Sequence, residues 1–254
     1  MTMSRWFLLL LLGQSCHAAA DSITFAINEA PPLIYLDQNR QAIGPGADLL
    51  RRIANESGIQ AQFAILPWMR AEETAKRTAN LCLPAFSQNP QRMPFFYWLG
   101  PMAKDQIILV SEHSSTISLQ SLTDVSKQKL RVGVMHGTLA EELLRQASVP
   151  TYVIASEESN LKMLQAGRID LWASLASTVK RSATLAHAPM PQKVMTIQNW
   201  TGYLACNINT DQSIINRLNA TMTRLREQGA FEMLGQGANH TKTATPPATH
   251  TNAQ

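Results

Sequence analysis

Residues 22–28 read SITFAIN and residues 46–57 read GADLLRRIANES, and these two segments together decide the fold. In the first segment apolar and polar residues alternate, as they do in a strand with one buried face. In the second, Leu49 and Ile53 lie on one side of a helix, and Gly58 follows as a stop signal. A strand followed by an amphipathic helix is the repeating unit of an α/β domain.

The same alternation continues along the chain. Further strands are predicted over residues 62–66, 80–86, 106–111, 130–135, 152–155, 169–173 and 201–208, and helices over residues 69–77, 138–146, 159–166 and 214–227. A segment rich in proline and aromatic residues, 94–101, separates an earlier series from a later one that begins at Leu130. Two α/β series in one chain predict two lobes.

Residues 1–20 have the pattern of a secretory signal peptide. An apolar run over residues 6–12 follows a basic residue, and small residues end at Ala20. The run is far shorter than the roughly 20 residues that cross a bilayer. We therefore expect an exported, periplasmic protein. A lipid anchor at Cys16 is the less favoured alternative, because Gly13 stands where a branched apolar residue is usual.

Composition excludes several classes of function. The chain has 254 residues, 45% of them hydrophobic, so it can bury a sizeable core. Its net charge of +4 comes from basic residues that are scattered singly, which argues against nucleic acid as a partner. No His or Cys pair has metal-ligand spacing, so we expect neither a metal site nor a cofactor.

Two cysteines remain after the predicted leader, Cys82 and Cys206. Each lies in an apolar, strand-like run, where a buried free thiol is the usual interpretation. A disulfide between them is permitted in an oxidising compartment, and strand order can place the two runs side by side. The sequence leaves both interpretations open.

The order of motifs resembles family 3 of the bacterial extracellular solute-binding proteins, the type associated with uptake of polar amino acids. The resemblance spans roughly residues 22–236, and it depends on the order and spacing of several motifs, none of which is specific alone. These are Ala30-Pro31-Pro32, Gly44 to Leu50, Pro67 to Ala71, Asn89 to Arg92, Trp98 to Pro101, Val132 to Thr138, Ala166 to Asp170 and Leu225 to Gly229.

The resemblance implies the two-lobed α/β fold of type II periplasmic binding proteins. Each lobe is then a mixed sheet flanked by helices, two hinge strands join the lobes, and the ligand binds in the cleft between them, where hinge closure encloses it. The expected division gives residues 21–102 and 195–238 to lobe 1 and residues 103–194 to lobe 2. Residues 239–254 lack an apolar face and are expected to form a disordered tail.

The resemblance also implies ligand-binding residues. Arg92 matches the arginine that forks two hydrogen bonds to the carboxylate of an amino acid, although most arginines simply lie in solvent. Ser87 matches a position that supplies a hydroxyl. Thr138 begins a helix with Glu141 in capping-box position, so the helix tip can hold an anion or can serve only as a good helix start.

Trp68 matches the aromatic wall of the cleft, although most tryptophans are core residues. Arg70, nearby, can add a second positive group, and Glu29 is a carboxylate close to the expected cleft. Where amino-acid binders often place an acid for the ligand ammonium group, this chain has Leu175. An ammonium group buried without an anion is costly, so the ligand either lacks one or is held differently.

The function predicted from this pattern is capture of a small polar or anionic solute, such as an amino acid or a related carboxylate, for ABC-type uptake. We expect a monomer whose partners are the solute and a membrane permease. A ligand sensor that reports to a membrane receptor uses the same closure and stays open as an alternative. A dehydratase acting on cyclic acids is less favoured, because no nucleophile and base occur at recognisable spacing and Glu29 is the one carboxylate to test. We therefore predict no catalytic residue.

Overall fold

The computed structural model describes residues 21–235. The predicted signal peptide, residues 1–20 with Cys16, and the predicted tail, residues 239–254, lie outside the described residues. Within residues 21–235 no helix has the length and apolar character needed to cross a membrane.

The chain alternates strands and helices throughout. The strands are β1 (Ser22–Ile27), β2 (Tyr35–Leu36), β3 (Ala42–Ile43), β4 (Gln60–Ile65), β5 (Leu81–Ser87), β6 (Phe96–Ser111), β7 (Val132–Met135), β8 (Thr151–Ile154), β9 (Leu171–Leu175) and β10 (Gln192–Asn207). The helices are α1 (Pro45–Glu56), α2 (Trp68–Ala75), the short 3₁₀ turn η1 (Met93–Phe95), α3 (Leu122–Lys127), α4 (Leu139–Gln146), α5 (Glu157–Gln165), α6 (Ala176–Leu185), α7 (Gln212–Glu227) and α8 (Glu232–Gly235).

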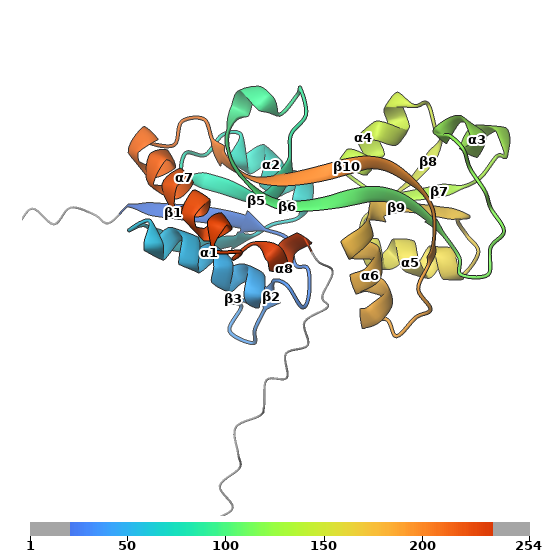
Figure 1. The fold of residues 1–254 in the computed structure, drawn as a ribbon, viewed down its shortest axis with the longest axis horizontal. Coiled ribbons are helices and arrows are strands. Elements are labelled where there is room, and N and C mark those ends of the chain that lie inside the picture. The colour runs from blue at the N-terminus through green and yellow to red at the C-terminus, as the bar shows by residue number, and fades with distance from the viewer. Residues whose placement is uncertain (1–20, 236–254) are drawn as a thin grey trace, which may run out of the picture.

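Two long strands, β6 and β10, join two bodies (Figure 1). The main sheet has the order β4-β1-β5-β10-β6-β9-β7-β8. In this sheet β1 is parallel to β4 and β5, and β7 is parallel to β8 and β9, whereas β10 is antiparallel to both β5 and β6, and β6 is antiparallel to β9. A separate small sheet pairs β2 and β3 antiparallel. The predicted two-lobed α/β fold with mixed sheets and two hinge strands is therefore confirmed. The expected lobe boundaries, at 102/103 and 194/195, fall inside these two strands.

Each lobe has apolar cores of its own. In lobe 1, α1 and α7 cover one face of the sheet with fully buried Ile53 and Leu218, and α2 covers the other face with Ala71 and Ala75. In lobe 2, the helices pack on β7 and β9 around residues that include Leu144. The polar side chains that remain at the facing edges of the two lobes are thus held on rigid elements.

The structure differs from the sequence-based prediction in two places that position the site. Most of the proline- and aromatic-rich segment 94–101 belongs to β6, which begins at Phe96 and continues to Ser111, because the backbone of β6 pairs with β10 over nearly this whole length. A helix that the sequence analysis did not predict, α6, follows β9 directly and lies on the side of lobe 2 that faces lobe 1 (Figure 1). Its residues Thr178 and Arg181 line the space between the lobes.

Cys82 and Cys206 form a disulfide across 124 residues of sequence. The two residues face each other in the antiparallel pair of β5 and β10, with their Cα atoms 4.0 Å apart. The structure therefore decides the question that the sequence left open, and the free-thiol interpretation is wrong. The bond ties the returning hinge strand to the centre of the lobe 1 sheet.

Candidate functional site

A cavity of about 640 Å³ lies between the two lobes. Lobe 1 contributes apolar side chains such as Leu33 and Leu50, together with Glu29 and Trp68. Lobe 2 contributes Thr138, Ser156, Glu157, Ser174, Ser177, Thr178 and Arg181. A mostly apolar hollow with a few polar groups, built from two lobes, is the usual form of a small-molecule site.

Four of the six predicted site residues line this cavity: Glu29, Trp68, Ser87 and Thr138. Glu29 follows β1 and accepts a hydrogen bond from the Leu36 backbone N–H at 3.0 Å. Trp68 begins α2 and packs on Phe86, with the ring centroids 5.4 Å apart. The tryptophan therefore packs against the core of lobe 1 and also lines the cavity between the lobes.

Arg92 differs from its predicted role. Its guanidinium is buried and pairs with the carboxylate of Glu72, with Nη2 to Oε2 at 2.8 Å and Nε to Oε1 at 3.2 Å. Nη1 donates to Ser87 Oγ at 3.0 Å, and the group stacks on Phe86 at 4.2 Å from the ring centroid. Arg92 is not part of the cavity lining. The fork that the sequence analysis assigned to a solute carboxylate is thus occupied by a carboxylate of the protein itself.

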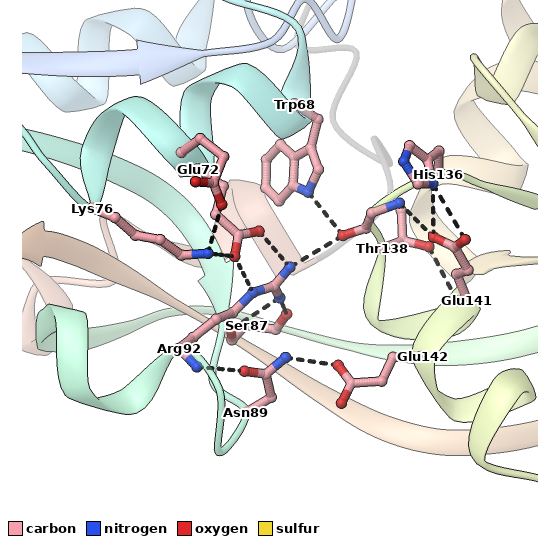
Figure 2. A network of polar contacts seen from close by, with 12 residues as sticks. Trp68, Glu72, Lys76, Ser87, Asn89, Arg92, His136, Thr138, Glu141 and Glu142 are labelled. Atoms are coloured by element: carbon pink, nitrogen blue, oxygen red, sulfur yellow. Dashed lines mark hydrogen bonds and ion pairs between the residues drawn. The ribbon is translucent and has the colours of Figure 1, made fainter.

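The same network crosses from lobe 1 to lobe 2. Arg92 Nη2 donates to the carbonyl oxygen of Gly137 at 3.1 Å, and Trp68 Nε1 donates to the same oxygen at 3.2 Å. Figure 2 shows both donors converging on this oxygen beside Thr138. Below them, Asn89 Nδ2 donates to Glu142 Oε2 at 2.7 Å. The lobes are therefore in direct contact through three hydrogen bonds at this edge of the cleft.

The start of α4 has the predicted cap but is not an open anion site. Thr138 Oγ1 accepts from the Glu141 backbone N–H at 3.3 Å and donates to the Met135 carbonyl at 2.8 Å. The Glu141 carboxylate reaches back to the Gly137 N–H at 2.6 Å (Figure 2). A side-chain carboxylate already lies at the positive end of this helix. Arg70, the remaining predicted residue, is exposed and outside the cavity lining.

Four charged residues that the sequence analysis did not single out line the lobe 2 side: Asp105, Glu157, Glu158 and Arg181. Glu157 begins α5 and accepts hydrogen bonds from Trp172 Nε1 at 2.9 Å and Ser174 Oγ at 2.8 Å. Asp105, on β6, accepts from the Ser177 backbone N–H at 3.1 Å, so it holds the first turn of α6. The sequence offered a weak signal for Glu157, since Ser156 before it is a typical N-cap residue.

Burial acts on the two innermost of these charges. It raises the pKa of Glu157 above its ordinary value, and hydrogen bonds from Ser174 and Trp172 and the charge of Arg181 offset only part of this effect. Burial likewise lowers the pKa of Arg181, against the charges of Glu157 and Asp105. An arginine with a lowered pKa still carries its charge at neutral pH. The cavity therefore contains a fixed cation with anions nearby.

Within residues 21–235, no group of three or more His, Cys, Asp and Glu side chains is gathered closely enough to hold a metal ion. The chemistry that the arrangement offers is recognition, through hydroxyl, guanidinium and carboxylate groups that line one cavity between the lobes. Together with the hinge strands, this geometry defines a two-lobed binding protein that closes on a small molecule.

Comparison with known proteins gives the family. Residues 23–236 match the bacterial extracellular solute-binding proteins, family 3, and the chain belongs to this family. No curated protein sequence matches the chain.

Several solved structures share the fold. A mutant of ArgBP from T. maritima has 16% sequence identity and a TM-score of 0.71, with 84% of this chain and 93% of that chain covered. A histidine kinase sensor domain with similarity to periplasmic binding proteins has 18% identity and a TM-score of 0.73, with coverages of 85% and 94%. An ancestral amino acid-binding protein, a precursor of cyclohexadienyl dehydratase, has 16% identity and a TM-score of 0.69, with coverages of 84% and 92%.

Proposed function

We propose that this protein is a periplasmic solute-binding protein that encloses a small polar solute, an amino acid or a related carboxylate, between its lobes. The observation that carries the proposal is the cavity of about 640 Å³ whose lining comes from both lobes. A ligand that touches both lobes stabilises the closed form over the open form, because in the open form the ligand can contact only one lobe at a time.

The polar groups of the cavity support a solute with both an acidic and a basic part. The sequence has Leu175 in place of an acid for a ligand ammonium group, but Asp105 and Glu157 also line the lobe 2 side of the cavity. β6 pairs with β9 such that Ile107 lies opposite Leu175, which brings Asp105 to the same edge of the cleft. Either carboxylate can serve as the anion for an ammonium group of the solute. An amino acid is therefore compatible with Leu175 at this position.

We assign Trp68, Ser87, Thr138 and Glu29 to the walls of this site, and Arg92 to the contact between the lobes. The hydrogen bonds from Arg92 and Trp68 to the Gly137 carbonyl oxygen support this division. Arg92 then acts on affinity through the closed state and not through direct contact with the solute. Export by a signal peptide and delivery to an ABC-type permease complete the proposed role.

A sensor is the second candidate, since a histidine kinase sensor domain shares the fold. The same closure serves both roles, and the partner distinguishes them. Co-purification with a receptor ectodomain favours sensing, and solute-dependent stimulation of a permease ATPase favours transport. The dehydratase alternative predicts turnover of a cyclic acid that is lost in Glu29→Gln.

A thermal-shift screen of amino acids and small carboxylic acids tests the proposed function. A solute that binds only the folded state stabilises it, by about 2.7 kcal/mol at a concentration of 100 times its Kd. The melting temperature rises as a result. Melting curves that no compound shifts, combined with no binding by titration calorimetry, would count against solute capture.

A further inference from the structure

Arg181 is the single basic residue in the lining of the cavity, within the part of the chain that the structure describes. It lies on α6, whose first turn is fixed by Asp105, so the helix presents the guanidinium at a defined place on the lobe 2 wall. A recognition group on a rigid helix is held more precisely than one on a loop.

The guanidinium of Arg181 has donors to spare. Its Nη2 donates to Thr178 Oγ1 at 3.3 Å, which is its one hydrogen bond among residues 21–235. No carboxylate of these residues lies within ion-pair distance of it, although a guanidinium has five N–H donors. Arg92 is the contrast, because Glu72, Ser87 and Gly137 use its donors.

The acids near Arg181 are occupied by other donors. Glu157 is held by Trp172 and Ser174, and Asp105 accepts from the backbone of Ser177. Both carboxylates act on Arg181 through their charge but do not contact it. Their negative charges therefore offset part of the cost of burying the guanidinium, and its N–H groups stay available to a bound solute.

We propose that Arg181 is the residue that recognises a carboxylate of the solute, so that the acidic end of the guest faces lobe 2 and not Arg92 in lobe 1. This inference rests on the proposed function, solute capture in the same cavity. A carboxylate fits better than a phosphate, because the planar fork matches two oxygens while Glu157 and Asp105 repel a second negative charge. The carboxylate of the solute would thus accept hydrogen bonds from the Arg181 N–H donors that the protein leaves unused.

The test uses matched pairs of compounds: α-amino acids and short mono- and dicarboxylates, each beside the primary amide that replaces its carboxylate, and inorganic phosphate. Titration calorimetry on the full chain measures the affinity. We expect the wild-type protein to bind at least one acid and to bind its amide at least about 100-fold more weakly, because the amide loses charge-assisted hydrogen bonds.

In Arg181→Met the affinity for that acid is expected to fall at least about 100-fold, and in Arg181→Lys by a smaller factor, since lysine keeps the charge but loses the fork. Arg168→Met is the matched control, because Arg168 is exposed on the same lobe and lies outside the cavity lining, and it should leave the affinity unchanged. The affinity of Arg181→Met for the matched amide should change little, because the amide makes no charge-assisted hydrogen bond with Arg181. A residue with a merely structural role would weaken binding of the acid and of the amide alike.

The outcomes separate the two claims. If Arg181→Met binds the acid as tightly as the wild-type protein, or if amides or phosphate bind better than acids, the role of Arg181 is overturned and solute capture stands. If the wild-type protein binds none of these probes, solute capture itself fails, and this inference fails with it.

Discussion

Arg92 and Glu72 meet fork to fork inside lobe 1, where both side chains are more than nine-tenths shielded from solvent. Removing one partner of such a pair leaves an uncompensated buried charge. We therefore expect Glu72→Ala to lower the free energy of unfolding by about 3–5 kcal/mol, measured by urea denaturation. Glu73→Ala is the control on the same helix, since Glu73 is half exposed, and its effect should be small. Equal effects of the two substitutions would contradict this account.

The free energy of unfolding should fall at acidic pH as Glu72 is protonated. Burial alone would raise the pKa of this carboxyl, but hydrogen bonds from Arg92 and Lys76 outweigh burial and lower the pKa below its ordinary value. The stabilisation is then complete above the unfolded-state pKa of about 4.3 and is lost as the pH falls through the folded-state value. Urea midpoints should fall more steeply below about pH 4.3 in the wild-type protein than in Glu72→Gln. Parallel curves would show that Glu72 does not contribute.

Glu157 predicts the opposite sign. Its pKa is raised, chiefly by burial, so the folded state binds a proton that the unfolded state has already released. Stability from this group is therefore present below its unfolded-state pKa and is lost as the pH rises through the folded-state value. Glu157→Gln should gain stability relative to the wild-type protein as the pH is raised from about 4.3 towards neutrality. A difference in urea midpoint that does not vary with pH would remove this interpretation.

The Cys82–Cys206 disulfide closes a loop of 124 residues. A cross-link of this span restricts the unfolded chain and contributes about 3–5 kcal/mol in the loop-entropy account. The double variant Cys82→Ala/Cys206→Ala should lose a comparable amount of unfolding free energy. Adding a reductant should destabilise the wild-type protein and leave the double variant unchanged. A thiol titration that finds two free cysteines in the denatured, non-reduced protein would refute the bond.

The sequence predicts the fold well because local and global signals agree in it. Helical spacing over 46–57 and alternation over 22–28 correspond to α1 and β1, and the two α/β series correspond to the two lobes. The prediction fails where tertiary pairing overrides local pattern. The sequence pattern places residues 94–101 between two α/β series and predicts no strand there, yet β10 pairs with residues from Phe96 onward and extends β6 through the hinge.

The candidate site was harder to predict, because a motif identifies a residue type and not its partner. The motif identifies Arg92, but the acid that pairs with it, Glu72, is 20 residues away on α2 and carries no sequence signal. Arg181 was missed together with its helix. Its segment lacks a side-chain N-cap, because the capping group comes from Asp105 on a distant strand.

Gly137 links the two lobes through its carbonyl oxygen, and a side chain at this position would press on lobe 1. A Cβ at this position would collide with Met69 Sδ and would lie 3.2 Å from Trp68 Cδ1, across the gap between the lobes. Met69 has a flexible, exposed side chain that can turn away, whereas the Trp68 ring, which packs on Phe86, has to shift by a few tenths of an ångström. We therefore expect Gly137→Ala to weaken the contact between the lobes and to weaken solute binding, with a larger radius of gyration in small-angle X-ray scattering. Gly167→Ala is the matched control, because its φ of +62° is close to the +76° of Gly137 while no atom lies within 4 Å of the added Cβ. Both variants should lose about 1 kcal/mol of stability from backbone strain, so the strain cancels in the comparison. Only Gly137→Ala should change the closure of the lobes, because only its Cβ meets the other lobe. A Gly137→Ala protein that stays compact and keeps the wild-type affinity would rule out direct contact of the lobes at this residue.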